Sequence, residues 1–214
     1  MPRDDRMPES NPFVEVAAHL FLEDLAATVG TAGLNTYLIG LAQKLADAMP
    51  REEYDTWEEF LDALRSGRSI LSTFEEVELV TPTCMVTRRS PFERGWREYA
   101  KRVGAFSPVH REVAQYYNAH VRPTAVTSLH IVHHAFREAA AKRVAVAGKP
   151  VRFEQIATAW VDGERQVLPK EKLAPLLARA GITETKLGML LRTNAEVVLL
   201  FAVELKAGAA AGGA

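Results

Sequence analysis

Cysteine is almost absent from this chain of 214 residues, which contains Cys84 and no other. A single cysteine excludes an internal disulfide and any zinc or iron–sulfur site built mainly from cysteine. A chain without disulfides fits a reducing compartment, so we expect a cytoplasmic protein. A lone cysteine in a predicted strand most often serves as a small buried hydrophobic residue, so we expect no catalytic thiol.

Long apolar stretches are also missing, because no uninterrupted run approaches the roughly 18 residues of a membrane-spanning helix. Residues 1–12 are polar and contain prolines, whereas a signal peptide needs an apolar stretch. Net charge is nearly absent, since 26 basic and 27 acidic side chains give a formal value of -1. We therefore expect no export, no membrane partner and no global attraction to nucleic acid.

Sequence signatures of common catalytic and phosphate-binding sites are absent too. The chain has no Gly-x-Ser-x-Gly, no glycine-rich phosphate loop, no His-Glu-x-x-His and no paired-cysteine motif. With 48% hydrophobic and 25% charged residues, it has the composition of a globular protein that buries a substantial core. These absences favour a binding or structural role over an enzyme.

The periodicity of apolar residues predicts one α+β domain over residues 12–206, with disordered tails at 1–11 and 207–214. Predicted helices, whose apolar residues recur every three or four positions, cover 12–30, 31–49, 57–65, 92–103, 107–144, 169–180 and 183–192. Predicted strands, rich in β-branched residues, cover 70–80, 84–89, 151–160, 164–168 and 195–205. Two tight hairpins predict a largely antiparallel sheet with a long histidine-bearing helix packed on it. Pro123 should kink or split that helix.

Five of the six histidines fall within residues 110–134. On a helix, His130 and His134 could hold one metal ion, with Glu138 one turn further along. At 100° per residue, however, that row drifts from the apolar stripe toward solvent, and His133 alone lies squarely on the stripe. We expect structural or ligand-contacting histidines and no metal, because two ligands on one helix leave a closed site incomplete.

Aromatic and histidine side chains could line an apolar pocket with a few polar tips between the histidine helix and the sheet. His133 would be the polar anchor, while Tyr117, Phe136 and Trp160 would form walls. The predicted ligand-binding residues are His133, His130, Tyr117, His120, Phe136 and Trp160. The alternative is that these are ordinary core or boundary residues.

Charge and small residues predict surfaces for protein partners. Residues 47–62 carry seven acidic and one basic side chain, a sum of -6, whereas 87–102 carry six basic and two acidic, a sum of +4. Either segment can be a solvated face or a docking surface for a partner. The predicted helix 31–49 bears Gly33 and Gly40 and more apolar surface than one stripe, which predicts a homodimer through this helix. Alternatively, neighbouring helices cover it.

Residues 173–192 have the helix, glycine turn and second helix of a DNA-binding helix-turn-helix. Five basic residues outnumber two acidic ones over 170–192, which suits phosphate contacts. The second helix offers few of the Asn, Gln or Arg side chains that read base edges, and strands flank the motif. Nucleic-acid binding is therefore the less favoured interpretation.

Two motifs near the second hairpin carry a family resemblance. Residues 148–154 read GKPVRFE, and residues 160–164 read WVDGE. Together with the element order over 13–168, they resemble the end of the 4-vinyl reductase domain, a relative of small vesicle-tethering subunits. The resemblance implies a long helix running into a strand with a Glu, a tight turn and a return strand. It also implies a small-molecule-binding or assembly module that is often dimeric and often attached to regulators.

The family pattern places cysteines, some of them zinc ligands, near Ala157 and Gln166 or Val167, and none of these is cysteine here. The resemblance therefore carries over no metal site. It favours a non-catalytic ligand-binding or sensor module that signals through a protein partner, with no cofactor identified. The alternatives are a structural assembly or trafficking-type subunit without a ligand, and a haem or metal protein that uses the histidines at 130, 133 or 134.

Overall fold

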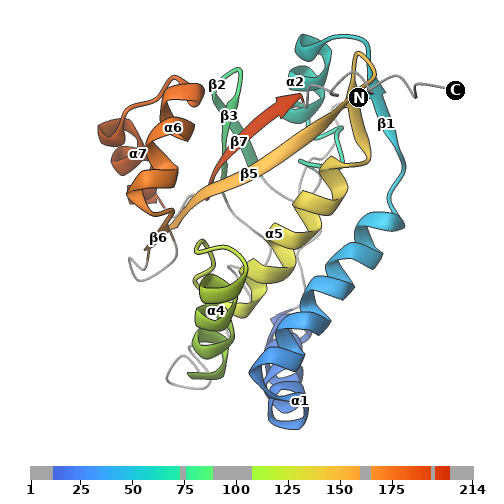
Figure 1. Ribbon diagram of the computed structural model, residues 1–214. Coiled ribbons are helices and arrows are strands. Elements are labelled where there is room, and N and C mark those ends of the chain that lie inside the picture. The colour runs from blue at the N-terminus through green and yellow to red at the C-terminus, as the bar shows by residue number, and fades with distance from the viewer. Residues whose placement is uncertain (1–11, 73–75, 89–107, 160–164, 194–195, 203–214) are drawn as a thin grey trace, which may run out of the picture.

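The computed structural model describes residues 12–72, 76–88, 108–159, 165–193 and 196–202, which form one α+β domain as predicted (Figure 1). The helices are α1 Pro12–Asp47, α2 Trp57–Arg65, α4 Pro108–His120, α5 Ser128–Ala141, α6 Lys170–Ala180 and α7 Glu184–Leu190, followed by a short 3-10 turn. The strands are β1 Glu52–Tyr54, β2 Glu76–Thr81, β3 Cys84–Arg88, β4 Val144–Val146, β5 Lys149–Ala159, β6 Arg165–Val167 and β7 Glu196–Ala202. The predicted helix at 92–103 and both predicted tails lie outside the described residues.

The sheet has seven strands in the order β1-β4-β5-β7-β3-β2, and β6 pairs with β5. The pair β1/β4 is parallel, and the other five described pairings are antiparallel. The prediction of a largely antiparallel sheet is therefore confirmed. Strands β1 and β4 were not predicted, because three residues are too few to show an alternating pattern.

The central strands β3, β7 and β5 lie between two layers of helices. Met85 and Val198 belong to the larger core, which α1, α4 and α5 share, whereas Val86 and Val197 belong to a second core with α6 and α7. Successive side chains of a strand point to opposite faces, so neighbouring residues enter different cores. Figure 1 shows α6 and α7 on the side of the sheet away from α5 and α1.

Helix α1 is broken at Gly30, whose φ of 73° and ψ of 170° are not helical. The break separates the two predicted helices 12–30 and 31–49 where a glycine can adopt a positive φ without steric cost. Beyond it, Leu34, Leu38, Ala42 and Ala46 form a fully buried stripe in the larger core, and α1 packs along α4 and α5.

By length and composition, α1 could also cross a membrane between Val16 and Asp47. A search for uninterrupted apolar runs missed this feature because polar but uncharged residues are scattered through the helix. A buried core helix meets the same criterion, and 28% of the most apolar window is buried.

The long predicted helix 107–144 is split, as the proline at 123 indicates, into α4 and α5. Its predicted end is wrong, because residues 144–146 form strand β4. Ala147 and Gly148 have φ values of 49° and 70°, which make a two-residue turn of the type I′ kind between β4 and β5. Alanine at the first turn position hides this hairpin from the sequence, since Asn, Asp or Gly is usual there.

We expect Ala147→Asn to stabilise the protein by about 1 kcal/mol, because Asn tolerates a positive φ better than Ala does. The Ala147 N–H donates to the carbonyl of Tyr54 at 2.8 Å, and Asn retains that donor. Urea unfolding monitored by tryptophan fluorescence measures the change. Ala147→Val, a β-branched residue, should destabilise the same turn; equal stability of the two variants would contradict the turn assignment.

Candidate functional site

Four polar side chains of α5 lie on one face of the helix. His130, His133, His134 and Arg137 have the spacing i, i+3, i+4 and i+7, which places them within an arc of about 100°. All four are buried. The prediction that the row from 130 to 134 drifts toward solvent is therefore wrong: α5 packs against α1 and α4 and also against β5, so it is enclosed on more than one side. Only the continuation of the row, Glu138, is exposed.

The sheet contributes a matching row of polar side chains. Thr87 of β3 and Thr158 of β5 are the cross-strand neighbours of Glu196 on β7, so all three project from one face of the sheet. The register shift between Gln155 and Ala157 lets Gln155 join them, and its amide nitrogen donates to the Thr158 hydroxyl at 3.2 Å. We call the following eight residues the polar layer: Thr87, His130, His133, His134, Arg137, Gln155, Thr158 and Glu196. Every one of them is buried.

Glu196 is the centre of the polar layer. Its Oε2 accepts a hydrogen bond from Nη1 of Arg137 at 2.5 Å, and its Oε1 lies 3.3 Å from Nδ1 of His133. Nε2 of His130 lies 3.6 Å from Oε1, and Nε2 of His134 lies 3.8 Å from Oε2. One carboxylate from β7 therefore faces the whole polar side of α5.

Arg137 is 2% exposed and has a partner on each side of its guanidinium. Besides the bond to Glu196, its Nη2 donates to Oγ1 of Thr87 at 2.8 Å. Its carbon Cζ lies 5.5 Å from the ring centroid of Phe153, within cation–π range. A buried charge needs this kind of compensation, because an unpaired one costs several kcal/mol.

The protonation state of His130 follows from its hydrogen bond to the start of α5. Its Nδ1 accepts the backbone N–H of Thr127 at 3.0 Å. A ring nitrogen that accepts carries no proton, so the neutral ring has its proton on Nε2, which faces Glu196. His130 therefore caps the helix in the way that Glu or Gln does in a capping box.

Burial and charged neighbours together determine the charges in the polar layer. It lowers the pKa of His130 to about 4 and that of His134 to about 3, although Glu196 opposes both shifts. Burial alone would raise the pKa of Glu196, but His133 and the guanidinium of Arg137 hold it well below its ordinary value. Burial also lowers the pKa of Arg137, and Glu196 opposes that shift. At neutral pH the layer thus holds an ion pair and neutral rings at 130 and 134.

The rings at 130 and 134 take part in this layer as hydrogen-bonding groups. A general acid or base works best with a pKa near the operating pH, and the pKa values of these two rings lie far below neutral pH. Burial raises the pKa of the Cys84 thiol to about 12, so this side chain is protonated. Cys84 also lies in the core beneath α6 and α7, away from the polar layer.

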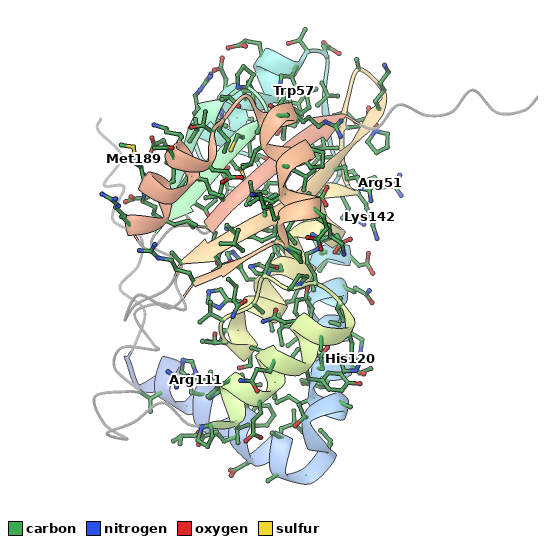
Figure 2. The ribbon with its side chains drawn as sticks, turned by 60° about the vertical axis from the view of Figure 1, so that its left-hand side comes forward. Arg51, Trp57, Arg111, His120, Lys142 and Met189 are labelled. Atoms are coloured by element: carbon green, nitrogen blue, oxygen red, sulfur yellow. The ribbon has the colours of Figure 1, made fainter. Side chains whose placement is uncertain are left out.

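The structure brings some of the predicted ligand-binding residues together. His130 and His133 are members of the polar layer, and Phe136 and Tyr117 are buried in the larger core that α5 shares with α4. His120, labelled in Figure 2, is exposed at the end of α4. Its ring stacks on that of Tyr116. The remaining predicted residue, the tryptophan at 160, lies outside the described residues.

Sequence reasoning missed Arg137, Glu196 and Thr87. One signal was available: the histidines and the arginine of α5 recur with helical spacing, which indicates a polar face rather than scattered polar residues. A second was the glutamate that opens the apolar stretch 196–202, because an acidic residue in such a strand needs a partner. The sequence could not show that Arg137 pairs with Glu196, since 59 positions separate the two residues.

Within the described parts of the chain, no group of three or more His, Cys, Asp or Glu side chains is arranged to hold a metal ion. The predicted acidic segment 47–62 is partly used inside the fold. Glu52 accepts hydrogen bonds from the hydroxyls of Tyr54 and Ser69 and from the N–H of Ile70. Most of the predicted basic segment 87–102 lies outside the described residues.

The pair α6 and α7 confirms the predicted helices around Gly181, which ends α6 with a φ of 66°. Both helices bury leucines in the second core, and α7 is seven residues long. The exposed side chains of α7 are Glu184, Thr185, Lys186 and Met189, the last at the periphery in Figure 2. This face of α7 carries no Asn, Gln or Arg, the side chains that most often read base edges.

The chain matches no protein-family model, no curated protein and no solved structure. The resemblance to the 4-vinyl reductase domain therefore stays a prediction.

We expect Glu196→Leu to destabilise the protein by about 3–5 kcal/mol, because it removes the carboxylate that compensates the buried charge of Arg137. The double variant Arg137→Met with Glu196→Leu should lose less stability than the single variant, since it removes both charges. Urea unfolding of the single variants and the double variant measures this coupling. Additive losses would show that the two side chains act independently.

Acid should destabilise the fold from about pH 6.5 downward. Burial lowers the pKa of His19 and of His110 to about 4, as it does for His130, and lowers that of His134 to about 3. The unfolded chain, with histidine pKa values near 6.5, then binds more protons than the folded chain, so stability falls as pH falls. Between pH 7 and pH 5 each group contributes a loss on the order of 2 kcal/mol.

Urea midpoints at pH 7 and pH 5 test this expectation. His134→Gln should reduce the difference between the two midpoints by the share of one histidine. His120→Gln, at an exposed position, is the matched control and should leave the difference unchanged. A wild-type midpoint that is the same at both pH values would refute the buried neutral histidines.

Proposed function

We propose that this protein is a non-catalytic ligand-binding or sensor module, with the polar layer as the binding site and a protein partner that responds to its occupancy. The observation that carries the proposal is unused hydrogen-bonding capacity. Nε2 of His134 and Oε1 of Gln155 are buried with no hydrogen-bond partner among the described residues. Each such atom costs about 1–3 kcal/mol, so it is normally paired with water or a ligand.

The ion pair at the centre of the layer favours a neutral ligand. Arg137 and Glu196 already neutralise each other, so a charged ligand would add an unmatched charge in a buried place. Gln155 uses its amide nitrogen toward Ala157 and Thr158, which leaves its oxygen as an acceptor. The ligand should therefore carry an N–H or O–H donor on a mostly apolar body, in keeping with neighbours such as Phe136.

The position of α5 supports a sensing role. It carries half of the polar layer on one side and packs against α1 on another. A ligand that shifts or rigidifies α5 would therefore act on α1, which carries most of the exposed large apolar side chains of the described residues. The second candidate, an assembly subunit without a ligand, rests on that same exposed face of α1.

The test is native mass spectrometry of freshly purified protein, combined with an absorption spectrum. We expect a neutral organic adduct that is released on denaturation. His134→Leu removes a nitrogen that has no hydrogen-bond partner, and the leucine side chain fills the space of the ring. This variant should fold with wild-type secondary structure and lose most of the adduct. His120→Leu removes an exposed histidine, and this variant should retain the adduct.

An adduct-free wild-type protein that binds no compound from a library of small neutral alcohols and amides would contradict the proposal in favour of the assembly subunit. A Soret band, or a metal in the native spectrum, would support the haem or metal alternative instead.

A further inference from the structure

Exposed large hydrophobic side chains gather on α1. Six of the eight on the described residues lie there, and the other two are Val121 and Met189. The six, between 36% and 57% exposed, are Leu20, Phe21, Val29, Tyr37, Leu41 and Leu45. Isolated exposed hydrophobic residues are ordinary, but the three beyond the break at Gly30 recur at every fourth position, which indicates an interaction surface.

The second half of α1 gives this surface a defined shape. Tyr37, Leu41 and Leu45 are four residues apart and form a ridge beside the buried stripe. At 100° per residue, Gly33 and Gly40 lie on the outer flank of that ridge, and Lys44 lies between this flank and Tyr37. Residues 25–43 contain no Asp, Glu, Lys or Arg, so Lys44 is the one charged residue along the ridge.

The charges around the ridge disfavour an anionic lipid surface as its cover. Glu23 and Asp24 precede the uncharged stretch and Asp47 follows it, against one basic residue, Lys44. The chain then enters the segment 47–62 with its sum of -6. Helices that lie on anionic membranes carry basic residues on their flanks, because the lipid surface is negative. Spanning the bilayer would remove the buried stripe of α1 from the core.

We propose that the ridge is covered by a second copy of this chain, in a two-fold dimer with the two α1 helices antiparallel. A parallel pair would place the two segments 47–62 side by side, and their like charges would repel. The antiparallel pair separates these segments to opposite ends and also opposes the helix dipoles. A two-fold axis makes the interface self-complementary, as one shared ridge requires.

The spacing of the ridge fixes a register. With the axis midway between positions 37 and 41, Tyr37 lies against the partner's Leu41, and Leu45 lies against the partner's Gly33. The contact then extends over the about 18 Å from position 33 to position 45. Each leucine at 45 meets a residue without a side chain, so the backbones can approach closely. This dimer does not depend on a ligand in the polar layer.

Sedimentation equilibrium of the full chain tests the interface. We expect wild-type protein to be dimeric at tens of micromolar and Gly40→Leu to raise the dissociation constant at least about tenfold. A Cβ at position 40 has nothing within 4 Å, so the substitution fits the monomer. Gly188→Leu on α7 also enters open space and should leave the dissociation constant unchanged. Gly33 is unsuitable, because a Cβ there lies 3.0 Å from that of Val29.

Disulfide trapping tests the direction of the helices, since the native Cys84 is buried. An oxidised mixture of Tyr37→Cys and Leu41→Cys proteins should form a cross-linked dimer containing one copy of each. Efficient cross-linking of Leu41→Cys protein alone would indicate parallel helices and overturn the register. A monomeric wild type, a fully dimeric Gly40→Leu protein, or cosedimentation of monomers with phosphatidylcholine vesicles would each overturn the proposal.

Discussion

The ion pair between Arg137 and Glu196 is the interaction on which the arrangement of α5 and the sheet depends. It joins the third turn of α5 to the start of β7, and the same guanidinium reaches Thr87 on β3. If α5 slid by one turn, these charges would be separated but would remain buried in the low-dielectric interior, where water could not solvate them. A buried pair adds little net stability compared with apolar packing, but it fixes one position for the helix.

Much of the fold could be predicted from local patterns. The helix pair around the break at Gly30, the helix 57–65, whose first turn Thr56 caps, and the turn at Gly181 are each determined by a few adjacent residues. The short strands β1 and β4 could not be predicted, because their pairing with each other and with β5 is a tertiary contact. Strand formation there depends on a neighbour rather than on the sequence of three residues.

The site was less predictable than the fold. The sequence placed His133 on the buried stripe of α5, but it placed His130 on a row that drifts toward solvent, because the helical-wheel argument assumed that α5 has one buried side. Because α5 is enclosed by helices as well as by strands, its polar residues are buried too, and each requires a partner. That partner, Glu196, is distant in the sequence, so periodicity alone could not supply it.

The contact between α1 and α5 is rich in alanine, which makes it rigid. Ala42 and Ala46 of α1, and Ala140 and Ala141 of α5, are buried in the core that these two helices share. An alanine has no side-chain torsion to rotate, so a junction rich in alanine cannot absorb a displacement by changing rotamers. A displacement of α5 would therefore move α1 as a rigid body.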